Sequence, residues 1–229
     1  EWGFERLKKA ALLVLKIELL ALKHGFTLKD ANCYNVQFKG TSPILIDTTS
    51  FEKYVKDSPW VAYRQFCENF LAPLALIAYK DLNLNKLFIL YPNGIPLDLA
   101  AKLLPFNKKF DLNLYMHIVL HSKIINKFST KSGSKELSLS KEKLENLIKS
   151  LVVAVENIKL KEKRTEWSDY YNKTNYDEAS FQSKKFTVKV FKDLVKPKTV
   201  IDFGANTGEF SRLFSSEKIT TLALDNDFM

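Results

Sequence analysis

The first two thirds of the chain have the apolar spacing of amphipathic helices. Apolar residues recur every three or four positions over residues 4–23, and Gly25 follows as a helix stop. The same spacing predicts helices over residues 112–128 and 140–162. Prolines and glycine interrupt residues 81–110, so short helices and turns are expected there. This part of the chain is therefore predicted to be mostly helical.

Two further patterns add strands and one more helix. Residues 34–38 and 44–46 are strand-like runs separated by a turn rich in glycine, serine and proline, so they predict a β-hairpin. Ser58 followed by Pro59 is typical of a helix N-cap with proline at the first helical position. The helix that they open is expected to run towards Pro73. These elements predict an α+β module.

The last fifty residues have a different order of elements. A helix is predicted near residues 178–195, and an apolar strand that starts at Thr199 follows it. A loop with two glycines leads to an amphipathic helix that includes Phe210, and residues 218–224 form a second apolar strand. A strand, a glycine loop, a helix and a second strand make the start of an α/β, Rossmann-like sheet.

The predicted organisation has three parts. Residues 1–130 form the mostly helical module, residues 131–165 a small polar linker and a connecting helix, and residues 166–229 the first part of an α/β domain. The chain begins with Glu1 instead of Met and ends directly after a strand, so we expect a fragment of a longer protein.

Composition narrows the class of protein. Hydrophobic residues make up 46% of the chain, enough for a folded core. The net charge is +9, but lysines are spread along the chain and mixed with acidic residues, which argues against a nucleic-acid partner. Two cysteines without CxxC spacing fit a reducing cytoplasm. No apolar run reaches the ~20 residues of a membrane helix, so a soluble, cytoplasmic protein without a membrane span is expected.

The glycine loop has the residues of a nucleoside-binding site. Gly204 and Gly208 let the main chain turn sharply and approach a ligand without a Cβ in the way. The loop amides and the following helix terminus offer hydrogen-bond donors. Asp225, just after the second strand, can accept hydrogen bonds from both hydroxyls of a ribose. Asp202 ends the first strand, where it suits a ligand with an ammonium group better than one with a pyrophosphate.

The spacing Asp202-x-Gly204-x-x-x-Gly208 followed by Asp225 resembles the first two motifs of class I S-adenosylmethionine-dependent methyltransferases, particularly a subgroup similar to nodulation proteins. Asn206 stands where the common family pattern has a third glycine, and asparagine is the residue after glycine that best tolerates a positive φ. Nicotinamide or flavin binding is the competing interpretation of such a loop.

The resemblance implies a cofactor and a role for each residue. S-adenosylmethionine is the implied cofactor and partner, and the methyl acceptor is unknown, with a glycan or other surface polymer suggested by analogy. Gly204 and Gly208 would line the methionine moiety, and Asn206 would be a further cofactor-binding residue of the loop. Asp202 would act on the amino group of the cofactor directly or through water. Asp225 would bind the ribose. Asp227 would lie near the ribose or the adenine edge.

The N-terminal module has a second candidate site. Asp30, Asn35 and Asp47 have the spacing of a kinase catalytic loop, in which the first Asp orients the attacking hydroxyl and the other two hold metal ions. The module thus resembles a kinase C-lobe, which would imply Mg²⁺ with ATP if it were active. The second Asp is followed by Thr48-Thr49 instead of Phe-Gly. Two alternatives to a methyltransferase stay open: a phosphotransferase, and a non-catalytic scaffold that supports docking or homo-oligomerisation.

Two histidines raise the question of a metal site. His117 and His121 are four residues apart on a predicted helix, so they share a face. No acidic residue lies between them and no third ligand is evident in the sequence. We therefore expect partly buried, hydrogen-bonded histidines and no metal centre.

Overall fold

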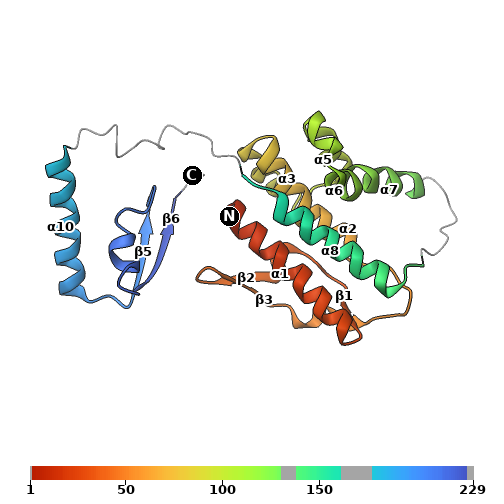
Figure 1. Ribbon diagram of the computed structural model, residues 1–229, viewed down its shortest axis with the longest axis horizontal. Coiled ribbons are helices and arrows are strands. Elements are labelled where there is room, and N and C mark those ends of the chain that lie inside the picture. The colour runs from red at the N-terminus through yellow and green to blue at the C-terminus, as the bar shows by residue number, and fades with distance from the viewer. Residues whose placement is uncertain (1, 130–137, 161–176, 226–229) are drawn as a thin grey trace. The chain divides into compact units, whose positions relative to one another are not determined.

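The computed structural model describes residues 2–129, 138–160 and 177–225, and the chain forms two compact units (Figure 1). Unit 1 comprises Glu1–Lys161 and unit 2 comprises Glu162–Met229. Most of the predicted linker lies outside the described residues. The connecting helix that was predicted to follow it belongs to unit 1.

Two long helices pack side by side in unit 1 (Figure 1). Helix α1, Phe4–Lys23, buries the apolar face that its spacing predicts, and helix α8, Lys141–Asn157, lies against it. Helix α8 ends earlier than predicted. The Lys8 ammonium group donates hydrogen bonds to the carbonyl oxygens of Glu156, at 2.9 Å, and Ile158, at 2.6 Å. A side chain of α1 thus satisfies carbonyls that the end of α8 leaves without helical partners.

Two small antiparallel sheets follow α1. Strand β1, Phe26–Leu28, pairs with β4, Phe51–Lys53. Strands β2, Val36–Lys39, and β3, Ser42–Leu45, form the predicted hairpin. The first hairpin strand begins later than predicted because the preceding residues form the short 3₁₀ helix η1, Cys33–Asn35, whose amide at Tyr34 is capped by the Asn32 side chain. The 3₁₀ helix η2, Thr48–Ser50, leads into β4.

A buried, continuous helical stretch then crosses unit 1. It comprises α2, Tyr63–Phe66, the π-helical segment η3, Cys67–Leu71, and α3, Ala72–Tyr79. The predicted helix start at Ser58 is wrong. The Ser58 hydroxyl donates to the carbonyl of Val55 at 2.7 Å, so it closes a local turn and does not cap the helix.

The predicted helix end at Pro73 is also wrong. Pro73 lies in the first turn of α3, where the π-helical segment η3 directly precedes it. A π-helical turn shifts the hydrogen-bond pattern, so the missing N–H of proline and its bulky ring are tolerated without ending the helix. Every residue from Cys67 to Ile77 except Glu68 is buried, which explains the uninterrupted apolar sequence around the proline.

The single helix predicted over residues 112–128 is a continuous helical stretch that contains a second π-helical segment. Short helices over residues 81–110 are present as predicted, and the segments of both regions complete unit 1. They are η4 (Leu82–Lys86), α4 (Leu87–Leu90), α5 (Leu97–Leu103), η5 (Phe106–Phe110), α6 (Leu112–Leu114), the π-helical η6 (Tyr115–Leu120) and α7 (His121–Ser129). Their apolar side chains join one hydrophobic core with α1, α3 and α8.

Unit 2 contains one long helix and a β-α-β unit (Figure 1). Helix α10, Glu178–Val195, matches its prediction, and the Asp177 side chain caps its first turn. Strands β5, Thr199–Phe203, and β6, Thr220–Leu224, are parallel. The helix between them, α11, Arg212–Ser215, is shorter than predicted. The loop before it contains residues with positive φ, which cannot continue a right-handed helix.

Helices dominate the described residues, which otherwise contain three two-stranded sheets. The parallel pair β5–β6 agrees with the predicted start of an α/β domain, but the described strands do not extend to a Rossmann sheet, and no kinase lobe is identified. Across the described ranges, no helix is long and apolar enough to cross a membrane.

Candidate functional site

The predicted glycine-loop residues of unit 2 lie together at one end of the β5–β6 pair. Because the strands are parallel and Asp202 is in register with Ala223, the chain leaves both strands at the same edge. Gly204 follows β5 and Asp225 follows β6. This is the edge at which α/β sheets bind ligands. Asp227 lies outside the described residues.

Hydrogen bonds tie the loop to the end of β6. The amides of Gly204 and Ala205 both donate to the carbonyl of Leu224, at 2.8 and 3.1 Å. The amide of Asn206 donates to the Asp225 carboxylate at 2.6 Å. Three successive loop amides are therefore directed at the carboxyl end of the second strand, which places Asp225 beside the loop.

The loop backbone has the left-handed conformations that its sequence suggests. Gly204, Asn206 and Gly208 have φ values of +73°, +46° and +78°. Asn206, the departure from a third glycine, adopts the conformation that asparagine tolerates best after glycine. A Cβ placed on Gly204 would have no other atom within 4 Å, so the space beside this residue is open.

The side chain of Asp202 is held by a residue that follows the glycine loop. The hydroxyl of Ser211 donates to the Asp202 carboxylate at 2.6 Å, and Ser211 itself is buried. Sequence reasoning did not single out Ser211. Its only sequence signal is its position at the entry to the helix nine residues after the aspartate. The contact fixes one carboxylate oxygen of Asp202, so the group is oriented before any ligand arrives.

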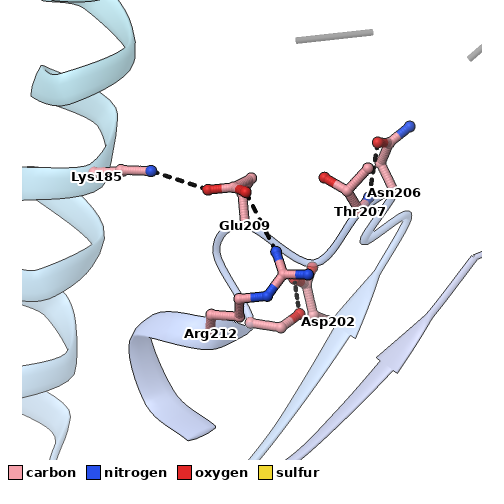
Figure 2. Close-up of polar contacts among 7 residues, drawn as sticks. Lys185, Asp202, Asn206, Thr207, Glu209 and Arg212 are labelled. Atoms are coloured by element: carbon pink, nitrogen blue, oxygen red, sulfur yellow. Dashed lines mark hydrogen bonds and ion pairs between the residues drawn. The ribbon is translucent and has the colours of Figure 1, made fainter. Parts of the chain in front are cut away.

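Helix α10 braces the same loop through an ion pair. The Lys185 ammonium group lies 3.0 Å from the Glu209 carboxylate, which also contacts the Arg212 guanidinium at 3.2 Å. Both contacts are drawn in Figure 2. The rings of Phe181 and Phe210 pack edge to face, 5.9 Å apart. Glu209 and Phe210 follow the second glycine directly, so α10 holds the far end of the loop. These bracing residues were also missed by the sequence analysis.

One curated protein matches most of the chain. The chain is similar to the nodulation protein NoeA of Rhizobium meliloti (strain 1021). The two are 34% identical over 217 residues, which cover 92% of this chain. The chain spans 46% of the length of NoeA, somewhat less than half. No protein-family model matches the chain, and no solved structure matches it. The chain is therefore related to NoeA, and the match alone assigns no reaction to it.

In unit 1, the structure connects two of the three kinase-like residues. The Asn35 amide donates to the hydroxyl of buried Ser50 at 3.4 Å, and that hydroxyl donates to the Asp47 carboxylate at 2.6 Å. Asp47 also accepts from the amide and hydroxyl of Thr49, at 2.9 and 2.6 Å. The hydrogen bond from Ser50, those from Thr49 and the charge of Lys29 lower the pKa of Asp47.

Asp30 has a local role in the structure. Its carboxylate accepts a hydrogen bond from the amide of Asn32 at 2.9 Å, which closes an Asx turn before η1. The pairing of β1 with β4 brings the amide of Lys29 within 2.8 Å of the carbonyl of Ser50. Asp30 and the Asn35–Ser50–Asp47 group therefore belong to the same part of unit 1, but no hydrogen bond joins them among the described contacts.

Of the two helix histidines, His117 is buried and hydrogen-bonded and His121 is partly buried, but His121 Nδ1 has no hydrogen-bond partner among the described residues, so the expected hydrogen bonding holds for His117 alone. His117 Nδ1 lies 2.7 Å from the Tyr63 hydroxyl and Nε2 lies 3.0 Å from the Ser150 hydroxyl. The His121 ring stacks on Tyr63 with centroids 4.3 Å apart, and burial lowers the pKa of both histidines to about 4. Both nitrogens of His117 are thus engaged in hydrogen bonds. Within the described ranges, no group of three or more His, Cys, Asp or Glu side chains is arranged to hold a metal.

Proposed function

We propose that unit 2 is the start of the S-adenosylmethionine-binding domain of a class I methyltransferase, and that the protein acts as a methyltransferase in its full-length natural context. The observation that carries this proposal is the hydrogen-bonded loop between β5 and β6, with left-handed Gly204 and Gly208 and with Asp225 held beside it. The relationship to NoeA, which is about twice as long as the aligned part, is compatible with a larger domain.

The residues at the loop fit the parts of the proposed cofactor. The open space beside Gly204 admits a ligand close to the main chain. Asp225 has two carboxylate oxygens for the two ribose hydroxyls, and Asp202, oriented by Ser211, offers a negative charge to the ammonium group of the methionine moiety. A nicotinamide dinucleotide would instead bring a pyrophosphate towards the Asp202 carboxylate, which like charges disfavour.

The cofactor would supply an electrophilic methyl group on a sulfonium sulfur. The chain's own contribution is to bind and orient. Asp202 would hold the amino group and Asp225 the ribose of the cofactor, while the Lys185–Glu209 ion pair and the Phe181–Phe210 contact keep the loop against α10. Such positioning is the main source of rate acceleration when two reactants need only be held in line. The described residues do not include an assigned acceptor site or general base.

Calorimetric titration of S-adenosylmethionine into the full-length protein tests this function. Asp225→Asn keeps an acceptor oxygen for the Asn206 amide but replaces a ribose acceptor with a donor, so we expect at least tenfold weaker binding. Asp193→Asn changes a largely exposed aspartate of α10 and is the matched control, with unchanged affinity expected. Equal affinity in Asp225→Asn and wild type, or no binding by the wild-type protein, would contradict the proposal.

A second candidate function is phosphoryl transfer by unit 1. The specific observation in its favour is the Asn35–Ser50–Asp47 hydrogen-bonded group, since the kinase pattern requires this Asn and this Asp to act at one site. It predicts Mg²⁺-dependent binding of ATP that Asp47→Asn abolishes and Asp57→Asn, a change in an aspartate of the turn after β4, leaves intact. Wild-type protein that binds ATP equally well with and without Mg²⁺, or not at all, would exclude it.

A further inference from the structure

Large apolar side chains face solvent along the segment from η5 to α7, the green part of unit 1 in Figure 1. Phe106 and Phe110 of η5 are 76% and 72% exposed, and their rings pack edge to face with centroids 5.0 Å apart. Leu112, at the start of α6, is 69% exposed. Because unit 1 has an extensive buried core, such a group of exposed apolar side chains indicates a binding surface.

The exposed apolar surface continues along the helical stretch after η5. Leu112 and Tyr115 are three residues apart, and a pair with this spacing shares a helix face. Leu120 and Ile124 are four residues apart and share a face for the same reason. Tyr115 and Leu120 begin and end the π-helical segment η6, whose five-residue repeat brings them to one side. We call this the η5–α7 surface, formed by Phe106, Phe110, Leu112, Tyr115, Leu120 and Ile124.

The segment that carries this surface is basic. Between Lys102 and Lys127 the sequence contains five lysines and a single acidic residue, Asp111. The Asp111 carboxylate accepts hydrogen bonds from two amides of the first turn of α6, at 3.1 and 3.2 Å, and so caps that helix. The Lys123 ammonium group lies 5.9 Å from the centroid of the Tyr115 ring, at the edge of the surface. Apolar side chains and positive charges therefore occur together.

This combination favours an anionic lipid surface over a protein partner. Lysine is depleted in protein–protein interfaces relative to the rest of the surface. At a membrane, lysines reach the phosphate groups of anionic lipids, while aromatic and aliphatic side chains enter the boundary between head groups and acyl chains. The aliphatic side chains of Leu112, Leu120 and Ile124 also distinguish the surface from a single-stranded nucleic-acid site, where bases stack on aromatic rings.

We propose that the η5–α7 surface binds peripherally to anionic lipid bilayers. Phe106, Phe110 and Leu112 enter the boundary between head groups and acyl chains, and the neighbouring lysines contact the lipid phosphates. Such binding needs no membrane-spanning helix, and none is found among the described residues. The surface belongs to unit 1 and does not depend on the cofactor proposed for unit 2.

Co-sedimentation of the full chain with lipid vesicles measures this interaction. The chain should bind vesicles of phosphatidylglycerol and phosphatidylcholine in equal amounts, and should bind phosphatidylcholine alone at least about tenfold more weakly. Each lysine near an anionic surface strengthens binding about fivefold. Lys109→Gln combined with Lys123→Gln should therefore weaken binding to the mixed vesicles by about 25-fold.

Phe106→Ser combined with Phe110→Ser tests the apolar part of the surface. Binding to the mixed vesicles should fall by at least about tenfold, because both rings lose their contact with lipid. Phe191→Ser is the matched control, since Phe191 is 63% exposed on α10 of unit 2, and it should bind like wild type. Hydrogen exchange of the wild-type chain needs no variant, and the mixed vesicles should slow it at the amides of residues 106–112.

No binding to the mixed vesicles, equal binding to both kinds of vesicle, or unchanged binding in the double phenylalanine variant would each overturn the proposal. Slower exchange confined to other residues would also overturn it. Sedimentation equilibrium without lipid tests a second copy of the chain as the occupant. Wild-type dimers that dissociate when Phe106 and Phe110 are replaced would assign the surface to self-association instead.

Discussion

The two units differ in how completely they bury their apolar residues. In unit 1, Phe66, Phe70 and Leu74 are fully buried in one core shared by α1, α3 and α8. In unit 2, Ile201 and Phe203 of β5 are 56% and 77% exposed, and Ala205 is the one buried hydrophobic residue among those described. Strand β5 was recognised from its sequence as an apolar strand, and yet two of its large apolar side chains are exposed, so sequence hydrophobicity alone does not reveal this difference.

Unit 2 has an apolar strand face that no described element covers. Parallel strands are normally covered on both faces, and two strands alone are marginally stable in water. Ile201 and Phe203 alternate with Val200 and Asp202, so they occupy one face of β5. Burying that face by further elements would complete the sheet that the proposed function requires. Because unit 1 already has an extensive buried core, we expect it to be the more stable unit of this chain.

The largest expected difference comes from removing one aromatic side chain from each unit. Phe70→Ala should lower the free energy of unfolding of unit 1 by about 3–5 kcal/mol, because the ring is fully buried. Phe203→Ala should change the stability of this chain by less than about 0.5 kcal/mol, because the ring is mostly exposed. Urea titrations followed by circular dichroism measure both. Similar losses in the two variants would show that the units are equally packed.

A smaller effect is expected from the buried hydrogen-bond chain of unit 1. The Tyr63 hydroxyl donates to His117 Nδ1, so the neutral imidazole donates from Nε2 to Ser150, whose hydroxyl donates to the Leu147 carbonyl at 2.7 Å. Tyr63→Phe leaves His117 Nδ1 without a donor and should cost about 1–3 kcal/mol. Tyr79→Phe removes a weaker contact of 3.5 Å to the Asn157 carbonyl and serves as the control.

Urea unfolding of a Trp167→Phe background reports on unit 1, because the two remaining tryptophans, Trp2 and Trp60, both belong to it. A loss in Tyr63→Phe no greater than in Tyr79→Phe would contradict the directed chain of hydrogen bonds.

We also expect the pH dependence of stability to arise in unit 1, because it contains the titratable groups with large pKa shifts. Burial lowers the pKa of His117 and His121 to about 4, so their stabilising contribution is complete above pH 6.5 and is lost as the pH falls towards 4. Burial raises the pKa of Glu18 to about 7, so its contribution is present below pH 4.5 and is lost as the pH rises through 7. Between about pH 4.5 and 6.5, unfolding should therefore take up two protons and release one, a net uptake of about one.

Stability of unit 1 should consequently fall as the pH is lowered from 6.5 to 4.5, with a slope of about one proton. Glu18→Gln removes the opposing group and should steepen the slope to about two. It also costs stability at every pH, because the two side-chain oxygens of Glu18 accept from the Thr27 hydroxyl and the Leu28 amide, both at 2.7 Å. Urea midpoints measured across this pH range provide the slope. Equal stability at both ends of the range would contradict this net uptake of one proton, and higher stability at pH 4.5 would mean that the histidines titrate normally.

The smallest change in stability is expected from the ion pair that joins the glycine loop to α10. Lys185 and Glu209 are partly exposed, so Lys185→Met should lower the stability of unit 2 by no more than about 1 kcal/mol. Hydrogen exchange at the amides that follow Gly208 should nevertheless become faster, because the ion pair holds this end of the loop against α10. Unchanged exchange there would show that the Phe181–Phe210 contact is sufficient by itself.

The sequence predicted elements well where local chemistry decides the structure. Helix α1, the β2–β3 hairpin, helix α10 and the order of β5, glycine loop and β6 all follow from spacing and turn residues. The predicted helix start at Ser58 and helix end at Pro73 are wrong, because their surroundings outweigh the local preference. The Ser58 hydroxyl donates to the Val55 carbonyl instead of capping a helix, and the π-helical segment before Pro73 accommodates the proline ring in a buried helix.

The candidate site was predictable in part for the same reason. Gly204, Gly208, Asp202 and Asp225 are recognisable from their spacing along one short segment. Ser211 and Lys185 act through hydrogen bonds and ion pairs whose partners depend on how the loop folds and how α10 packs.

Photochemical labelling with radiolabelled S-adenosylmethionine tests the central claim most directly. The full-length protein would be irradiated with the cofactor, digested and mapped, with S-adenosylhomocysteine as competitor. We predict competitor-sensitive label in the peptides that span residues 199–225 and none in those of unit 1. Label confined to unit 1, or label that the competitor does not reduce, would contradict the assignment of the β5–β6 loop as the cofactor site.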